Sequence, residues 1–154
     1  MIPSGEAIVP FNRDGDQPEV QTVHDVQEIH DEIIQQISSL KSEGYENIAV
    51  ICKTAAESLN AYEALSSDIQ VKLIKKTTLS FERGVHIIPA YLAKGVEFDA
   101  VLIYDGSNTK YTREAERKLF YTACTRAMHL LHIYSQGKPS RFITEADPAT
   151  YVIR

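Results

Sequence analysis

The sequence predicts an α/β fold in which a mostly parallel sheet carries helices on both faces. Two observations predict it. Short apolar runs bounded by turn residues recur along the chain, and helical segments with amphipathic periodicity or capping residues stand between them. The chain has 154 residues, of which 44% are apolar and 24% are charged. This length suggests one domain with a sizeable core.

Periodicity and capping residues predict the helices. Over residues 23–43, apolar side chains recur at three- and four-residue steps, and Gly44 ends the amphipathic helix that this pattern indicates. Thr54 is a suitable N-cap for a second helix, because Glu57 follows at the capping-box spacing. Thr112 is predicted to cap a third helix, which carries Leu119, Ala123 and Ala127 on one side.

The expected strands are five short apolar runs, at residues 47–52, 71–74, 85–88, 100–104 and 130–134. Residues 1–22 are rich in Pro and Gly, which predicts a loop-rich N-terminal segment with one short strand near residues 7–11. Residues 23–135 are expected to form the domain itself. Residues 136–154 are expected to form a C-terminal tail or an edge strand.

Composition and charge exclude several classes of protein. The net charge of −5 argues against a dedicated nucleic-acid coat protein, although it allows a local basic site. Cys52 and Cys124 are too few for a disulfide framework, and both are expected to be buried thiols. The sequence has no signal-type stretch and no run long enough to span a bilayer, so a cytoplasmic protein is expected.

Common phosphate and metal motifs are missing from the sequence. Gly137-Lys138 is followed by Pro139, so it is not a P-loop. No His/Cys cluster has metal-ligand spacing, and no metal site is predicted. Asp105 follows a buried strand, but Gly106 behind it favours a turn over a magnesium ligand.

Two segments combine polar residues with neighbouring apolar strands: residues 91–99 and residues 119–133. On their own, the residues allow a structural interpretation. Arg126 would be a cation at a helix C-terminus, where it interacts favourably with the helix dipole. Glu97 would be a solvated carboxylate, and Gly95 a turn glycine.

A resemblance to a known family favours a functional interpretation. KGVEFDAVLI (Lys94–Ile103) resembles motif V of the UvrD/Rep-type superfamily 1 DNA helicases, FYTACTRAMHLLHI (Phe120–Ile133) resembles motif VI, and IAVICKTAAES (Ile48–Ser58) is similar to motif IVa. The order of the motifs implies the second RecA-like domain, domain 2A, which is a three-layer structure. Tyr91 and the stretch PFNRDGDQP resemble the helicase IV/helicase D branch, some of whose members bind RNA polymerase.

The resemblance implies two groups of site residues. The nucleotide-binding group would consist of Lys94, Gly95, Glu97 and Arg126. The DNA-binding group would consist of Lys53, Thr54, Tyr91 and Ala93. Arg126 would correspond to the family's catalytic arginine finger, which stabilises charge on the transferred phosphoryl group. Glu97 would accept a hydrogen bond from the ribose, and Tyr91 would stack on a base.

The resemblance also implies what the chain works with. ATP and Mg²⁺ would be held mainly by an N-terminal RecA-like domain with the P-loop, so the 154-residue chain is expected to be inactive alone. The expected partners are that domain, single-stranded DNA and, in the helicase D branch, RNA polymerase. Two alternatives stay open: the motor domain of an RNA-polymerase-associated remodelling factor, and a non-enzymatic RecA-like interaction module. A role in DNA repair or transcription would follow.

Overall fold

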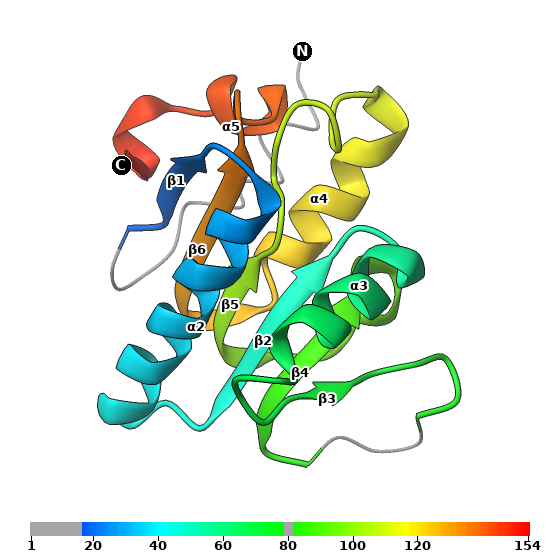
Figure 1. Cartoon of the computed structure of the whole chain (residues 1–154). Helices are drawn as coiled ribbons and strands as arrows, with labels where there is room; N and C mark the ends of the chain where they lie inside the picture. Colours follow the sequence, from blue (N-terminus) through cyan, green and yellow to red (C-terminus); the bar gives the residue numbers. More distant parts are fainter. Residues whose placement is uncertain (1–16, 79–81) are drawn as a thin grey trace.

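A single parallel sheet organises the computed structural model, which describes residues 17–78 and 82–154 (Figure 1). Its seven strands lie in the order β3-β4-β2-β5-β6-β1-β7, and every paired strand is parallel to its neighbour. The strands are β1 (Glu19–Val23), β2 (Asn47–Cys52), β3 (Lys72–Leu73), β4 (Gly84–Pro89), β5 (Phe98–Ile103), β6 (Ala127–Gln136) and β7 (Val152–Ile153).

Helices cover both faces of this sheet. The α-helices are α2 (Val26–Ser42), α3 (Ala55–Leu65), α4 (Arg117–Cys124) and α5 (Arg141–Thr144), and the 3₁₀ helices are η1 (Ala90–Leu92), η2 (Glu114–Glu116) and η3 (Pro148–Thr150). Buried residues of α2 and α3 pack with one face of the sheet, and those of η1, α4 and α5 pack with the other (Figure 1). The predicted α/β class with helices on both faces is therefore confirmed.

The first two helices and the strand between them follow the local sequence signals. Asp25 caps α2, and Thr54 caps α3 by accepting a hydrogen bond from the N–H of Glu57 at 3.0 Å. The expected strand at residues 47–52 is confirmed as β2.

The predicted start of the third helix is wrong. α4 begins at Arg117, after the 3₁₀ turn η2, and Ala127 belongs to β6 instead of the helix. The reason is the carboxylate of Glu116, which accepts the N–H groups of Thr112 and Arg113 at 3.0 and 2.9 Å. These bonds hold the chain in a tight turn before the helix, and they occupy the backbone of Thr112.

Strand β1 lies in the segment that was expected to be loop-rich. Its residues Glu19–Val23 pair with β6 on one side and with β7 on the other. Val20 in β1 and Tyr151 beside β7 are both buried in the core. The sheet therefore uses residues on both sides of the expected boundaries at 22 and 135. The short strand expected near residues 7–11 lies outside the described residues.

Two further expectations concern the core and the surroundings of the protein. Cys52 and Cys124 are both buried, as the sequence predicted. Over the described ranges, no helix is both long enough and apolar enough to cross a bilayer.

Candidate functional site

The parallel sheet places most of the predicted site residues at the two opposite ends of its strands. Strands β5 and β6 begin at Phe98 and Ala127, so Glu97 and Arg126 lie at their amino ends. Lys94 lies in the connection from η1 to β5 and lines the same pocket as Tyr91. Strands β2 and β4 end at Cys52 and Pro89, so the residues that follow them lie at the carboxyl edge. We call the first set of strand ends the amino edge and the second set the carboxyl edge. Both terms refer to the ends of strands and not to the outermost strands β3 and β7.

A backbone hydrogen bond joins the two segments of the amino edge. The N–H of Phe98 donates to the carbonyl of Arg126 at 2.9 Å, which fixes Glu97 beside Arg126. Lys94 and Glu97 are both exposed. Gly95 has a positive φ of 81°, and a Cβ at this position would meet no atom within 4 Å. The amino edge thus presents a cation, a carboxylate and an open stretch of backbone to solvent.

The guanidinium of Arg126 folds back on the end of α4. Its Nε donates to the carbonyl of Thr122 at 3.1 Å, and its Nη2 donates to Oγ1 of Thr125 at 3.2 Å. This is the helix-end geometry that the structural interpretation predicted. A guanidinium carries five N–H donors, so these two bonds leave most of its face available for an anion.

At the carboxyl edge, Lys53 is engaged within the protein. Its ammonium pairs with the carboxylate of Glu116 and lies 5.6 Å from the ring centroid of Tyr111. Thr54 uses its side-chain oxygen to cap α3, although the residue is exposed. A contact between Lys53 and DNA would therefore require the ion pair with Glu116 to loosen.

The other two residues of the DNA-binding group differ in exposure. Tyr91 is 53% exposed and projects from η1, directly after β4. Ala93 is fully buried in the core, so neither its side chain nor its backbone is accessible to a ligand in this structure. Of the four residues expected to bind DNA, Tyr91 offers the largest accessible surface for stacking.

Glu116 is a residue of this edge that the sequence interpretation missed. Burial alone would raise the pKa of its carboxyl, but hydrogen bonds from Lys53 and from the backbone N–H groups of Arg113 and Thr112 lower the pKa to about 2. Its negative charge is therefore permanent at neutral pH, and it holds Lys53 in place. The available signal was a carboxylate four residues after Thr112.

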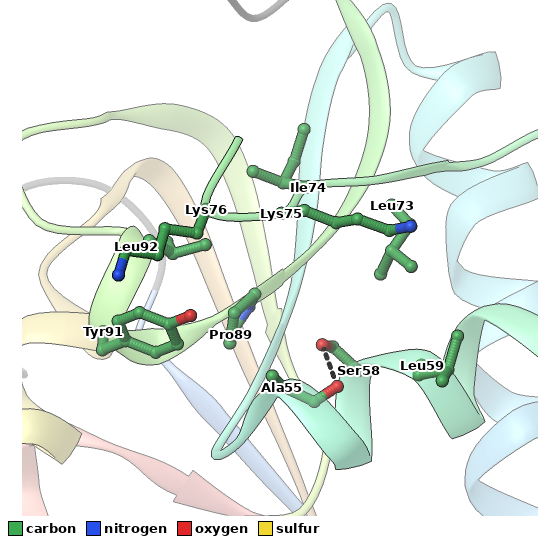
Figure 2. Close-up of a pocket in the computed structure, with 10 residues that line it drawn as sticks. All are labelled: Ala55, Ser58, Leu59, Leu73, Ile74, Lys75, Lys76, Pro89, Tyr91 and Leu92. Carbon is green, nitrogen blue, oxygen red and sulfur yellow. Dashed lines mark hydrogen bonds between the residues drawn. The ribbon is translucent and has the colours of Figure 1, made fainter. Parts of the chain in front are cut away.

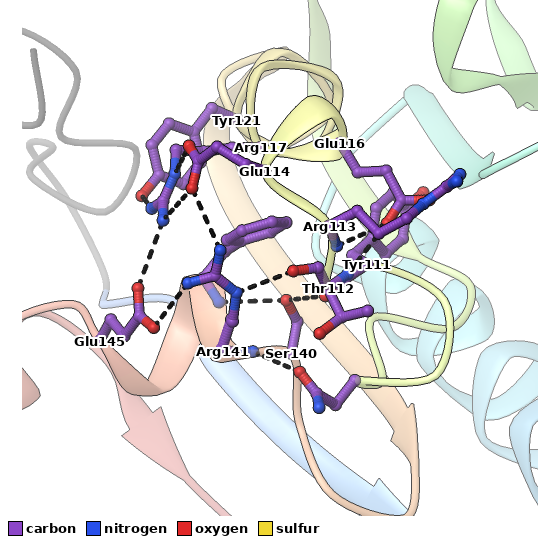
Figure 3. A network of polar contacts seen from close by, with 12 residues as sticks. Tyr111, Thr112, Arg113, Glu114, Glu116, Arg117, Tyr121, Ser140, Arg141 and Glu145 are labelled. Carbon is purple, nitrogen blue, oxygen red and sulfur yellow. Dashed lines mark hydrogen bonds and ion pairs between the residues drawn. The ribbon is translucent and has the colours of Figure 1, made fainter.

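A second polar network lies beside Glu116 and ties α4 to α5 (Figure 3). Glu114 and Glu145 alternate with Arg117 and Arg141 in ion pairs of 2.6–3.3 Å. Both guanidinium groups also lie over the ring of Phe142, at 4.7 and 5.2 Å from its centroid. This network stabilises the packing of the C-terminal segment.

Asp105 has the structural role that its neighbour Gly106 suggested. Its carboxylate accepts the N–H groups of Ser107 at 3.2 Å and Gln136 at 3.0 Å, which confirms the turn. Across residues 17–78 and 82–154, no group of three or more His, Cys, Asp or Glu side chains is arranged to hold a metal ion.

Comparison with solved structures defines the class of the fold. S. cerevisiae Dbp5 L327V, bound to RNA and ADP BeF3, aligns at a TM-score of 0.67 with 12% identity; the match covers 94% of this chain and 40% of that one. The E. coli DEAD-box protein SrmB, bound to the regulator of ribonuclease activity A, aligns at 0.59 with 9% identity over 80% of this chain and 79% of SrmB. These likenesses establish a RecA-like fold.

The family follows from two further matches. The profile of the UvrD-like helicase C-terminal domain matches residues 84–134, which include both segments of the amino edge. The crystal structure of the C-terminal domain of a possible DNA helicase from Lactobacillus plantarum is 35% identical, with a TM-score of 0.83 over 92% of this chain and 88% of that one. The chain therefore belongs to the UvrD-like helicase C-terminal domain family. No match is found among the curated proteins.

Proposed function

We propose that this chain is the C-terminal motor domain of an ATP-dependent DNA helicase or translocase. In this proposal the amino edge faces the nucleotide, and the carboxyl edge forms part of the track for single-stranded DNA. The observation that carries the proposal is the hydrogen bond between Phe98 and Arg126, because it places Glu97 and Arg126 side by side. Membership of the helicase family supports the same assignment.

The residues of the amino edge suit one side of a bound ATP molecule. The exposed carboxylate of Glu97 can accept a hydrogen bond from a ribose hydroxyl, and Lys94 adds positive potential near the phosphates. Gly95 has no side chain to block the approach of the nucleotide, and the space where a Cβ would stand is open. ATP would supply the phosphoryl group, and Mg²⁺ would neutralise part of its charge. The N-terminal domain with the P-loop would hold most of both ligands.

Arg126 is the proposed arginine finger. To reach a phosphate of ATP on the other domain, its guanidinium exchanges the bonds to Thr122 and Thr125 for bonds to phosphoryl oxygens. Each bond lost is worth about 0.5–1.5 kcal/mol net, and charge-assisted bonds to a phosphate are stronger. The exchange is therefore favourable only when the nucleotide is present and the two domains close.

The test is DNA-stimulated ATP hydrolysis by the complete parent protein with Arg126→Ala. An arginine finger contributes about 10³-fold or more to turnover, so kcat is expected to fall by that factor while ATP binding is largely retained. The matched control is Arg154→Ala. This change removes an exposed guanidinium that pairs with Glu19 near β7, outside both groups of predicted site residues. Arg154→Ala is expected to keep normal turnover.

Near-normal turnover by Arg126→Ala would contradict the proposal, and it would leave Arg126 with the helix-end role alone. The isolated 154-residue chain provides a second test. Because the P-loop belongs to the other domain, the purified chain is expected to hydrolyse no ATP, with or without DNA.

A further inference from the structure

A pocket with a volume of about 220 Å³ opens beside Tyr91, between α3 and the loop that follows β3 (Figure 2). Ser58 and Leu59 line it from α3, Lys75 and Lys76 from the loop, and Pro89 and Tyr91 from the end of β4 and η1. Sites for drug-sized ligands usually enclose roughly 300–1,000 Å³. This pocket is therefore suited to a single ring system.

The walls of the pocket are apolar and partly open to solvent. Leu59 is 45% exposed and Tyr91 53% exposed, and both are among the few large apolar side chains exposed in the described part of the chain. Ser58 is only 2% exposed, and its hydroxyl donates to the carbonyl of Ala55 at 2.9 Å. A hydroxyl that donates one bond can still accept another. The pocket thus combines an aromatic ring, an aliphatic wall and a buried acceptor.

Two cations stand at the rim. Lys75 and Lys76 are exposed, and neither forms an ion pair with any residue that the structure describes. In Figure 2, Lys76 extends towards Leu92 and Lys75 towards Leu73, so the two ammonium groups diverge along the opening. The rim therefore carries two adjacent positive charges on a chain whose net charge is −5.

The backbone that carries these lysines is held in place. The N–H of Lys75 donates to Oγ1 of Thr78, and the N–H of Thr78 donates to the carbonyl of Lys75, both at 2.9 Å. The N–H of Ile74 donates to the carbonyl of Ile87 in β4 at 2.8 Å. The rim is therefore anchored to the sheet before any ligand arrives.

We propose that this pocket takes one base of single-stranded DNA, with the phosphates on either side of that base bound by Lys75 and Lys76. The base stacks on Tyr91 and packs against Leu59, and a base N–H group donates to the hydroxyl of Ser58. Stacking on an aromatic ring accepts any base, and point charges accept any phosphate, so the pocket reads no sequence. The inference rests on the proposed function, and it adds α3 and the β3 loop to the DNA track.

The charge of the rim favours nucleic acid over an apolar partner. An apolar peptide or a small hydrophobic ligand would use Leu59 and Tyr91, but it would gain nothing from the two ammonium groups. A DNA strand uses both features, because it alternates apolar rings with anionic phosphates. Tyr91 also lines a second pocket, of about 290 Å³, towards α4, so the strand can continue past this ring.

The first experiment is an NMR titration of the isotope-labelled chain with an eight-residue thymidine oligonucleotide at low salt. We expect shift changes at Leu59, Lys75, Lys76 and Tyr91. Changes around Thr54 without changes in the pocket would overturn the pocket and leave the proposed DNA track standing. No change at either place would overturn both.

The second experiment separates the base from the phosphates. Tyr91→Ala should weaken binding of the thymidine oligonucleotide by about fivefold or more, since stacking on one aromatic ring has an effect of that size. Tyr91→Ala should leave the affinity for an abasic oligonucleotide of the same length unchanged. Tyr91→Phe, which keeps the ring, should bind the thymidine oligonucleotide as tightly as the wild type. An equal loss on both oligonucleotides would contradict a base in the pocket.

The double variant Lys75→Ala/Lys76→Ala tests the rim. It should weaken both oligonucleotides and reduce the slope of log K against log salt by about 1.4, since each phosphate contact with a single strand contributes about 0.7. The control is Lys41→Ala/Arg83→Ala, which removes the same charge from positions beside the amino ends of β2 and β4, outside the pocket. An unchanged slope in the Lys75/Lys76 variant, or an equal reduction in the control, would contradict the proposed phosphate contacts.

Discussion

Glu116 forms an ion pair with Lys53 and also accepts hydrogen bonds from the turn that precedes α4. Its carboxylate receives the ammonium of Lys53, the backbone N–H groups of Thr112 and Arg113, and the guanidinium of Arg113 at 3.2 Å. The side chain is 8% exposed, so these partners replace the water that burial removes. One buried carboxylate thereby fixes both the position of Lys53 and the conformation of the chain before the helix.

The lowered pKa of Glu116 predicts a pH dependence of stability. The pKa falls from 4.5 in the unfolded chain to about 2 in the folded protein, so the charged form stabilises the fold above pH 4.5, and this contribution is lost as the pH falls towards 2. Glu116→Gln should reduce the free energy of unfolding at pH 7 by about 3 kcal/mol, an order-of-magnitude value. The measurement is urea unfolding of both proteins between pH 7 and pH 3.

The difference between the two proteins should shrink steadily below pH 4.5, because protonated Glu116 resembles glutamine. Glu63→Gln, on the exposed surface of α3, is the control and should remain close to wild type at every pH. A difference for Glu116→Gln that stays constant down to pH 3 would show that its carboxylate is not held charged by its partners.

Among the elements, those with local signals were predicted from the sequence, and those that depend on distant contacts were not. α3 was placed correctly because Thr54 and Glu57 lie within one turn of each other. The start of α4 was misplaced because Glu116 binds backbone groups and Lys53, which lies 63 positions away. β1 is only five residues long, three of them polar, and its pairing with β6 decides its conformation. Such pairing leaves no pattern in a five-residue window.

Capping by Thr54 gives the prediction for α3. Its side-chain oxygen satisfies the N–H of Glu57, which has no partner within the helix. Thr54→Ala should therefore reduce the free energy of unfolding by about 1 kcal/mol, while Thr54→Ser should keep most of the stability. Thermal or urea unfolding of the isolated chain measures both. Equal losses in the two variants would mean that the methyl group of Thr54, and not its oxygen, stabilises the helix start.

On the scale of the whole molecule, the sheet determines which site residues can act together. The motifs assigned the candidate residues to particular segments, but they did not show that Ala93 is buried or that Lys53 pairs with Glu116. Nor did they indicate the pocket beside Tyr91, since Leu59, Lys75 and Tyr91 come from three separate elements. Packing between distant segments creates these features, and a single sequence carries no direct record of it.

The separation of the two edges predicts that their functions can be changed independently. A six-residue strand such as β4 spans roughly 17 Å at about 3.3 Å per residue, which is twice the screening length of about 8 Å at physiological salt. In the complete parent protein, Glu97→Ala should raise KM for ATP about tenfold with kcat nearly unchanged, because a ribose contact binds ground state and transition state alike. It should not change the affinity for single-stranded DNA measured without nucleotide.

Tyr91→Ala should show the reverse behaviour. Its affinity for single-stranded DNA, measured without nucleotide, should fall about fivefold or more, while its affinity for ATP, measured without DNA, stays the same. Measuring each variant in the absence of the other ligand is essential, because ligands that bind one protein are linked through its conformational equilibrium. If Glu97→Ala weakened DNA binding as strongly as Tyr91→Ala, the two edges would not be separate sites, and the assignment of nucleotide and DNA to opposite ends of the strands would be wrong.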